Sequence, residues 1–453
     1  MTISIVGLGK VGLSLASCLV AGGHRVVGVD IDERLVAALN AGDVDTPEPG
    51  VRERFAQASA GVFKATSDIA AAVCETELTF VVVPTPSNSL GGFSLRYVLP
   101  VCETVGQALR AKPSRHTIAI VSTMLPASSE AIVVPCLERA SGRKIGDGLG
   151  YCYNPSFIAL GEVVKGIVAP DYVLIGESDK TSGDLVLGVH KSIVTSNFPI
   201  ARMSPTEAEI TKIASNTHET MRVSFANMLM SICSEVPGAD VDRITEALAH
   251  RMGKRFFKGA LPYGGPCWPR DNVAFTAFID AIRSPSTLPR AVDTFNSDHA
   301  RYVLRKILTV SSVGDTIGLL GLAYKPGTPV TDRAFALDLA AWLPQEGRKV
   351  VGWDPLAADE VRRMFGDRLG YADTAEACLS ASAVTVVTIP LPEFESVDWS
   401  AAARTTIIDG WRCLPRAAME ACAKYVALGR GPAGAVAPWI SRTVGDYFDL
   451  LTS

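Results

Sequence analysis

The chain has 453 residues, of which 48% are hydrophobic and 20% are charged, and its formal net charge is −4 at pH 7. This length predicts two or three domains, and the balanced charge excludes the basic surface that nucleic-acid binding requires. Ten cysteines without CxxC or finger-like spacing, an apolar first strand in place of a signal segment, and no apolar run of membrane length predict a cytoplasmic protein without metal or membrane partners.

The first predicted elements are a strand over residues 3–6, a glycine turn and a helix over 13–21. The turn reads Gly7-Leu8-Gly9-Lys10-Val11-Gly12, and a second strand over 25–29 ends at Asp30, about 20 residues further on. Glycines let the backbone approach a pyrophosphate, and a carboxylate at this offset holds a ribose diol and repels a 2′-phosphate. The pattern predicts an NAD-binding Rossmann-like domain, with a plain tight turn as the alternative.

Two further strands, over 78–83 and 117–121, are each followed by a polar loop. The loops are Pro84-Thr85-Pro86 and Ser122-Thr123-Met124-Leu125-Pro126. Ligands of open α/β sheets gather beyond the carboxyl ends of the strands, so Thr85 and Thr123 are candidates to face a cofactor or substrate. Helix capping is the alternative for both residues.

A helix start signal, Ser204-Pro205-Thr206-Glu207, opens a stretch without proline or glycine that runs to about residue 236. This predicts one helix of some thirty residues that joins domains or forms a dimer surface. Lys212 and Asn216 stand four residues apart and share a helical face, where they can stabilise charge on a substrate oxygen. A solvated surface pair is the alternative.

The loop Tyr263-Gly264-Gly265-Pro266-Cys267-Trp268-Pro269-Arg270-Asp271 precedes a helix-like run over 272–282. Cys267 is therefore expected near a helix N-terminus with Arg270 close by, and both features favour a nucleophilic thiolate. Asp271 can serve as a base or orient a water molecule. The alternative is that Cys267 is a small buried hydrophobic residue.

The last part of the chain repeats the α/β pattern, with strands over 316–320, 350–353, 383–389 and 406–409. Here the stretch from Gly321 to Arg333 replaces the dinucleotide glycines, and Lys325 and Arg333 indicate phosphate binding without a second NAD. The sequence thus predicts an α/β protein with two Rossmann-like domains joined by a long central helix. The expected domains are 1–201 for NAD, 202–300 for the central helices and the cysteine, and 301–453 for a nucleotide.

In this order and over nearly the whole chain, these motifs resemble the UDP-glucose/GDP-mannose 6-dehydrogenase family. Asn154-Pro155 and Asp409-Gly410-Trp411-Arg412 add to the resemblance. It implies a homodimer that oxidises C6 of a nucleotide-linked hexose from alcohol to carboxylate, with NAD as the cofactor, and most readily UDP-glucose to UDP-glucuronate.

The resemblance also implies residue roles. Cys267 would form a thiohemiacetal and then a thioester, Lys212 and Asn216 would stabilise oxyanions, and Asp271 and Thr123 would position or activate water. Together with the glycine fingerprint, it implies cofactor contacts from Gly7, Gly9, Lys10, Val11, Gly12, Asp30, Arg34, Thr85, Thr123 and Arg270. It implies substrate contacts from Ser156, Phe157, Lys212, Asn216, Arg251, Phe257, Tyr263, Gly264, Lys325, Arg333 and Arg412, with Arg251 lent to the neighbouring subunit.

The chain departs from the family pattern beside Asn154-Pro155. Ser156 stands where the family usually has glutamate, and Leu160 replaces a second one. Serine cannot take up a proton near neutral pH, so either Asp271 and Lys212 carry the acid/base work alone or the substrate and reaction have drifted. A silent nucleotide-sugar binding protein is a further alternative, although binding alone needs no thiol nucleophile.

Overall fold

The computed structural model describes residues 1–59, 61–432 and 434, and the chain divides into two compact units. The first unit comprises Met1–Ser215 and Val273–Ser284, and the second comprises Asn216–Asn272 and the chain from Pro285 onward. Helices α9 (Pro205–Glu235) and α11 (Trp268–Ala281) each contribute residues to both units. The 31 residues of α9 confirm the predicted long central helix.

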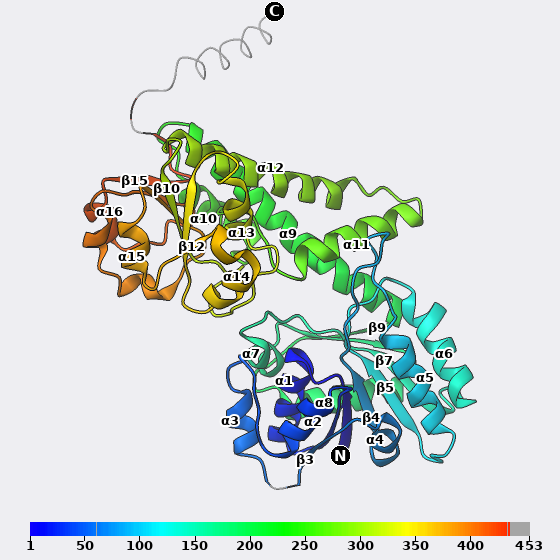
Figure 1. Cartoon of the computed structure of the whole chain (residues 1–453). Coiled ribbons are helices and arrows are strands. Elements are labelled where there is room, and N and C mark those ends of the chain that lie inside the picture. The colour runs from blue at the N-terminus through cyan, green and yellow to red at the C-terminus, as the bar shows by residue number, and fades with distance from the viewer. Residues whose placement is uncertain (60, 433, 435–453) are drawn as a thin grey trace, which may run out of the picture. The chain divides into compact units, whose positions relative to one another are not determined.

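Within the described residues, nine strands of the first unit form one sheet (Figure 1). Its first six strands follow the Rossmann order 3-2-1-4-5-6, and all neighbours are parallel except β7 and β8. In spatial order the strands are β3 (Phe63–Thr66), β2 (Arg25–Val29), β1 (Thr2–Val6), β4 (Leu78–Val81), β5 (His116–Ile120), β7 (Gly148–Tyr153), β8 (Val173–Glu177) and β9 (Ile200–Met203), with β6 (Lys144–Ile145) beside β7.

Alternate side chains of these strands supply two apolar layers. Ile118 and Ile120 belong to one buried cluster and Ala119 and Val121 to the other, because successive residues of a strand point to opposite faces. The first layer contains α4 (Ile69–Glu75), α5 (Val98–Leu109) and α6 (Val134–Ser141). The second contains α1 (Lys10–Ala21), α3 (Val51–Ala56), α7 (Val163–Val168) and α8 (Lys180–Ile193). The remaining helices of this part are α2 (Glu33–Asn40) and the π-helix η1 (Ser129–Val133).

The second unit holds a parallel sheet with the same strand order (Figure 1). Its strands in spatial order are β12 (Gly370–Tyr371), β11 (Lys349–Trp353), β10 (Thr316–Leu320), β13 (Val384–Val387), β14 (Thr406–Asp409) and β15 (Lys424–Ala427). The α-helices in the described part of this unit are α10 (Val241–Met252), α12 (Thr287–Thr309), α13 (Phe335–Trp342), α14 (Ala358–Phe365), α15 (Ala375–Ser380) and α16 (Arg416–Ala421), in addition to its share of α9 and α11. Two Rossmann-like parts and a long helix confirm the predicted fold class.

The second sheet repeats the glycine turn of the first without its open carboxylate. Gly321 has φ +102°, and its amide donates to Trp353, as the Gly7 amide donates to Val29. Asp354 stands where Asp30 stands in the first unit, but it is buried and accepts four backbone amides, from Leu322, Ala323, Leu356 and Ala357. Its acceptor positions are full, which supports the prediction that this part does not bind a second dinucleotide.

No helix among the described residues is both long enough and apolar enough to cross a membrane.

Candidate functional site

The glycine turn of the first unit links β1 to α1. Gly7 has φ +97°, and a Cβ on Gly12 would lie 1.8 Å from the Gly7 carbonyl oxygen, so the turn needs both glycines. Gly9 is exposed, and a Cβ there would meet no atom within 4 Å. Lys10 is exposed and Val11 is half-buried beside it. The unpaired amides of the first turn of α1 and the open space at Gly9 fit the pyrophosphate of a dinucleotide.

Asp30 follows β2 and holds the glycine turn. One of its carboxylate oxygens accepts the Leu8 amide at 2.7 Å and the other accepts the Asp32 amide at 3.0 Å. A carboxylate offers about four acceptor positions, so Asp30 can still bind the two hydroxyls of a ribose. Arg34 is exposed on the first turn of α2. These residues fit NAD, whose ribose carries no 2′-phosphate.

The loops after β4 and β5 are tied together. The Thr85 hydroxyl donates to the Thr123 carbonyl oxygen at 2.7 Å, and the Ser122 hydroxyl donates to the Val83 carbonyl oxygen at 2.6 Å. Thr85 is buried, whereas Thr123 is half-buried. Thr85 therefore fixes the backbone of the Thr123 loop, which is more than the simple capping role considered from the sequence.

Lys212, Ser156 and Phe157 come together in the first unit. Lys212 is 8% exposed, its Nζ donates to the Ser156 carbonyl oxygen at 2.9 Å, and it lies 4.5 Å from the centroid of the Phe157 ring. Phe157 in turn contacts Tyr172, with ring centroids 4.7 Å apart. Burial excludes the solvated-pair interpretation of Lys212, because a side chain that is 8% exposed is largely removed from water.

Cys267 stands at the start of α11. Its side chain is exposed, and its carbonyl oxygen accepts the Asp271 amide at 2.8 Å, so it occupies the N-cap position of the helix. The helix begins at Trp268, four residues before the predicted start. The interpretation of Cys267 as a buried hydrophobic residue is therefore wrong, and its exposed thiol lies at the N-terminus of a helix.

Asp271 is brought together with Asn216 in the second unit. It is 1% exposed, and its Oδ2 accepts from Asn216 Nδ2 at 2.7 Å. Its Oδ1 accepts from the Arg270 guanidinium, at 3.1 Å from Nε and 3.0 Å from Nη2. A buried carboxylate held by an amide and a guanidinium is fixed in position one helical turn from Cys267.

A second polar network holds the other end of the Cys267 loop. Tyr263 and Asn272 both donate to Asp293 Oδ1 at 3.0 Å, and Thr217 donates to Asn272 at 2.8 Å. Burial raises the pKa of Asp293 and holds the pKa of Tyr263 well above its ordinary value. The Tyr263 hydroxyl thus positions the loop, and the substrate contact of Tyr263 stays a prediction.

The paired glycines of this loop pack on the loop that carries Lys325 and Arg333. A Cβ on Gly264 would lie 2.0 Å from the Arg333 carbonyl oxygen, and one on Gly265 would lie 2.7 Å from the Tyr324 ring. The Gly265 amide also donates to the Asp332 carbonyl oxygen at 2.9 Å. The structure thus joins the cysteine loop to the loop that carries the half-buried Lys325 and the exposed Arg333. Arg333 has a φ of +47°, and such strained backbone conformations are common at functional sites.

Gly265→Ala is expected to lower the free energy of unfolding by about 1–3 kcal/mol, because φ is +90° and the new methyl group would press on the Tyr324 ring. Chemical denaturation measures the change. Gly327→Ala is the matched control, since Gly327 also has a positive φ of +74° but a Cβ there would meet nothing within 4 Å. Equal losses in both variants would show that the close approach is not what requires Gly265.

Arg251 and Phe257 belong to the second unit. Arg251 is exposed at the end of α10. Phe257 is buried, its ring stacks on Phe225 with centroids 6.0 Å apart, and the Arg222 guanidinium lies 5.2 Å from its centroid. Arg222 also donates to the carbonyl oxygens of residues 252, 253 and 255 and so fixes this loop. The Phe257 ring packs within the second unit, and its contact with substrate stays a prediction.

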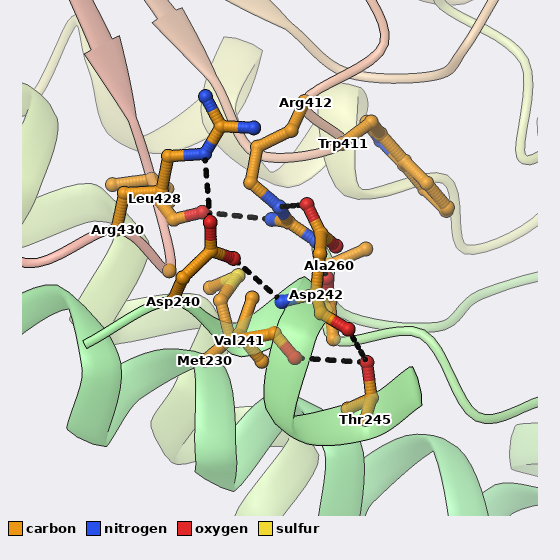
Figure 2. A network of polar contacts seen from close by, with 12 residues as sticks. Met230, Asp240, Val241, Asp242, Thr245, Ala260, Trp411, Arg412, Leu428 and Arg430 are labelled. Carbon is orange, nitrogen blue, oxygen red and sulfur yellow. Dashed lines mark hydrogen bonds and ion pairs between the residues drawn. The ribbon is translucent and has the colours of Figure 1, made fainter. Parts of the chain in front are cut away.

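Arg412 does not line an open site. Its guanidinium is 0% exposed and forms a bidentate pair with Asp242 of α10, at 2.8 and 2.9 Å (Figure 2). Its other donors reach the carbonyl oxygens of Gly259, Leu428 and Gly410. All five guanidinium donors are occupied, which argues against the predicted diphosphate contact from Arg412.

The motif that contains Arg412 is instead a structural turn. The Asp409 carboxylate accepts the amides of residues 411 to 414 and the Tyr425 hydroxyl. This turn gives Arg412 a φ of +51° and directs its side chain toward α10. Within the described residues, no cluster of three or more metal-ligating side chains is present.

Sequence reasoning missed the residues that position the site. Asp293, Asn272 and Asp242 carry the networks described above, and Glu209 is buried one turn before Lys212 on α9. Only Glu209 had a usable signal, its three-residue spacing from Lys212 on a helical face.

The strand order, the glycine turn and Asp30 fit a dinucleotide-binding Rossmann-like domain of the kind found in NAD-dependent oxidoreductases. Three family models match successive parts of the chain: the NAD binding domain over 1–194, the central domain over 206–298 and the UDP binding domain over 318–416. All three describe one family, and the chain belongs to it: the UDP-glucose/GDP-mannose dehydrogenase family. Its activity is that of a nucleotide-sugar 6-dehydrogenase with NAD as cofactor.

Similar proteins span nearly the whole chain. The UDP-glucose 6-dehydrogenase AglM of Haloferax volcanii is 33% identical over 92% of this chain and 98% of its own. The GDP-mannose 6-dehydrogenase of Pseudomonas syringae pv. syringae is also 33% identical, over 83% of this chain and 85% of its own. The solved UDP-glucose dehydrogenase of Pyrobaculum islandicum superposes with a TM-score of 0.85 at 30% identity, covering 95% of this chain and 98% of its own.

Proposed function

We propose that this chain oxidises the C6 alcohol of a UDP-hexose to the carboxylate through a thioester on Cys267, with UDP-glucose as the preferred substrate. The observation that carries the proposal is an exposed cysteine at a helix N-cap, four residues before a buried aspartate that is held by Asn216 and Arg270. The relatives from Haloferax volcanii and Pyrobaculum islandicum support UDP-glucose as the substrate.

The residues of the first unit would hold the cofactor. Gly7, Gly9 and the first turn of α1 would receive the pyrophosphate, and Asp30 would bind the adenosine ribose. When bound, NAD accepts the hydride of each oxidation, which is the chemistry that the cofactor supplies. Lys325 and Arg333 would hold the substrate diphosphate through charge-assisted hydrogen bonds.

The bond changes at Cys267 balance. After the first oxidation gives an aldehyde, the thiolate adds to the carbonyl carbon and forms a C–S bond, leaving a thiohemiacetal. Loss of the remaining C6 hydrogen as hydride gives the thioester, and water then breaks the C–S bond to release the carboxylate and the thiol. Each alcohol thus consumes one water and yields two reduced cofactors. Lys212 and Asn216 would stabilise the oxygen as charge develops, and Asp271 and Thr123 would orient the water.

The test is NADH formation across a panel of UDP- and GDP-linked hexoses. The expected result is an NADH burst and steady turnover, highest with UDP-glucose, with two NADH formed per uronate. No NADH with any member of the panel would overturn the proposal. Thermal stabilisation by nucleotide sugars without NADH would favour a silent binding protein instead.

Asp30→Asn is expected to raise the KM for NAD and to reduce the preference for NAD over NADP. The amide keeps an acceptor for the Leu8 amide but removes the charge that repels a 2′-phosphate. Initial rates with each cofactor give the ratio of kcat/KM values, and a change of roughly 10-fold corresponds to about 1.4 kcal/mol. The exposed Asp32→Asn on the next turn is the matched control, and an unchanged ratio in Asp30→Asn would remove Asp30 from cofactor selection.

Ser156 supports one alternative, in which this family member acts on a different substrate or hydrolyses the thioester slowly. Its carbonyl oxygen binds Lys212, but its side chain cannot act as a base. Ser156→Glu is expected to speed the step after the NADH burst without changing the burst itself, measured by stopped-flow absorbance. If the steady rate is the same in both proteins, hydrolysis was never limited by Ser156.

We also propose a cytoplasmic homodimer with functional segments 1–201, 202–300 and 301–453. On α9, the exposed side chains of Phe225, Met228 and Ile232 recur at helical spacing and leave an apolar stripe suited to a partner subunit. Arg251 would reach the substrate of that partner. Light scattering of the wild type and of an Ile232→Asp variant tests the dimer, which is expected to dissociate in the variant.

A further inference from the structure

Glu209 is a buried carboxylate that the proposed mechanism does not use. It lies on α9, is 0% exposed, and shares a helical face with the buried Lys212 and Ile213. Its hydrogen-bond partners in the described part of the chain are uncharged. Burying a carboxylate without a cation costs several kcal/mol, so a side chain placed here for packing alone would be apolar.

The contacts of Glu209 form a chain with a fixed direction. Its Oε1 accepts the Ser129 amide at 2.8 Å and the Ser129 hydroxyl at 2.7 Å. The Ser129 hydroxyl lies 2.6 Å from the Tyr151 hydroxyl. Because Ser129 gives its proton to Glu209, Tyr151 must donate to Ser129. The chain joins β7, η1 and α9 and ends on the carboxylate.

Ser129 marks one end of the Thr123 loop. It is the first residue of the π-helix η1, and the other end of the loop is held by the hydrogen bond from Thr85 to the Thr123 carbonyl oxygen. Between them, Ala127 has a φ of +68°. A π-helix and a left-handed non-glycine residue persist only where surrounding contacts enforce them, and both cluster at functional sites. Glu209 supplies the enforcing contact.

We propose that Glu209 is a positioning residue that locks the Thr123 loop to the face of α9 that carries Lys212. This inference rests on the proposed function, which gives Thr123 and Lys212 roles in the reaction. Since a helix is rigid over one turn, the carboxylate that anchors the loop also sets the rotation of α9, and so the place of Lys212 Nζ 2.9 Å from the Ser156 carbonyl oxygen.

The ionisation of Glu209 offers a way to observe this role. Burial raises its pKa to about 7, the Ser129 hydroxyl and amide and the Ala127 amide lower it, and Glu130 raises it. Glu130 on η1 and Tyr151 on β7 are the other titratable groups that act on it from neighbouring elements. Hydrogen bonds to an ionised acceptor are about twice as strong as those to a neutral one. The lock therefore weakens as the pH falls through about 7.

Glu209→Gln imitates the protonated form at every pH, because the amide keeps the acceptor oxygen and loses the charge. At pH 8 its kcat is expected to fall by roughly 10-fold, to the level that the wild type shows at pH 6, with little further change on acidification. Its Tm at pH 8 should equal or exceed that of the wild type. The raised pKa means that ionised Glu209 makes the fold less stable as pH rises, and the amide removes this effect.

Glu207→Gln is the matched control, since Glu207 lies two residues away on the same helix but is exposed. Its carboxylate accepts hydrogen bonds from the Ser204 amide and hydroxyl. This variant should keep the wild-type kcat and pH profile. Hydrogen exchange supplies a readout without catalysis: amides 123–131 should exchange faster in Glu209→Gln and in Ser129→Ala, but not in Glu207→Gln. The Ser129→Ala variant should also lower kcat, and the double variant should lose no more than Glu209→Gln alone.

Wild-type exchange together with a wild-type kcat and pH profile in Glu209→Gln would overturn the proposal, as would a loss of kcat that merely follows a lower Tm. Faster exchange in Glu209→Gln in a protein that forms no NADH with any nucleotide sugar would uphold the lock and refute the proposed function instead.

Discussion

Cys267→Ser is expected to lower the rate of uronate formation by on the order of 10⁴-fold or more. A serine hydroxyl at the same N-cap position stays protonated near neutral pH, whereas the helix terminus and Arg270 can stabilise a thiolate. Without a thiolate no thiohemiacetal forms, and the second hydride has no path to leave. Asn216 and Asp271 hold their positions through contacts that do not involve the sulfur, so the loss is expected to be chemical rather than structural.

The measurement counts NADH and product for each active site. The wild type should form two NADH per uronate, and rapid acid quenching followed by mass spectrometry should detect a sugar adduct on Cys267. The variant should form at most one NADH per site, without an adduct. This distinguishes loss of the thioester from loss of substrate binding, which would abolish the first NADH as well.

Cys74→Ser provides the matched control because Cys74 is also exposed but lies on α4 of the first unit. The Cys74→Ser variant should keep wild-type turnover, and iodoacetamide should still inactivate it by alkylating Cys267. Bound nucleotide sugar should cover Cys267 and protect it from this alkylation. Full turnover in Cys267→Ser would remove the thioester mechanism while leaving the family membership intact.

The sequence predicts the fold well because its signals are local. Apolar runs of strand length end in glycine at residues 7 and 321, and the uninterrupted run after Pro205 has no helix breaker, so both Rossmann-like parts and α9 follow from short windows. The start of α11 was misplaced because Pro269 suggested a loop. Proline is well tolerated in the first turn of a helix, and it stands there at the second position.

The sequence likewise predicts the local part of the candidate site but not its long-range contacts. Residues within a motif, such as Cys267 and Asp271, are correctly placed relative to each other by their spacing. The residues that hold these motifs in place are not predicted by spacing, because each comes from far along the chain. Asp293 binds Tyr263 from 30 residues away, and Glu209 binds Ser129 from 80 residues away. No periodicity reports such pairs, and only the packing of α9 and α12 on their neighbours creates them.

Arg412 has a structural role that its motif does not predict. Its diphosphate contact is an expectation from the family resemblance, and nothing in the local pattern Asp409-Gly410-Trp411-Arg412 reveals Asp242, which lies 170 residues earlier. The structure therefore changes the expected outcome of a substitution there from a loss of affinity to a loss of stability.

Arg412→Met is expected to lower the free energy of unfolding by about 1–3 kcal/mol, because the fully buried guanidinium satisfies backbone carbonyl oxygens, whereas the Asp242 side chain is 37% exposed and can regain water. The variant loses the pair with Asp242 and leaves the carbonyl oxygens of Gly259, Gly410 and Leu428 without their donor. Denaturation by urea at pH 7 measures the change. The KM for the nucleotide sugar, measured on the folded protein, should stay within about 2-fold of the wild type, far from the 10-fold that 1.4 kcal/mol of lost binding would give.

The pH dependence of stability provides a second test of the Arg412–Asp242 ion pair. Burial raises the pKa of Asp242, but the hydrogen bonds and charge of Arg412 outweigh burial and hold it below its ordinary value. A lowered carboxyl pKa contributes stability that is present above the unfolded value, near 3.9, and is lost as the pH falls below it. Arg412→Met should therefore lose part of the acid-induced destabilisation that the wild type shows below about pH 4.

Arg430→Met is the matched control for Arg412→Met, because Arg430 pairs with Asp240 in the same network but at 3.6 Å and with 46% of its side chain exposed (Figure 2). An exposed pair of this kind contributes about 0–1 kcal/mol, so this variant should unfold nearly as the wild type does. If Arg412→Met instead kept its stability and raised the KM for the nucleotide sugar 10-fold or more, Arg412 would bind the diphosphate after all. To bind the diphosphate, Arg412 would have to break its hydrogen bonds to Asp242 and three carbonyl oxygens. An exposed arginine such as Arg333 would not lose such bonds on binding substrate.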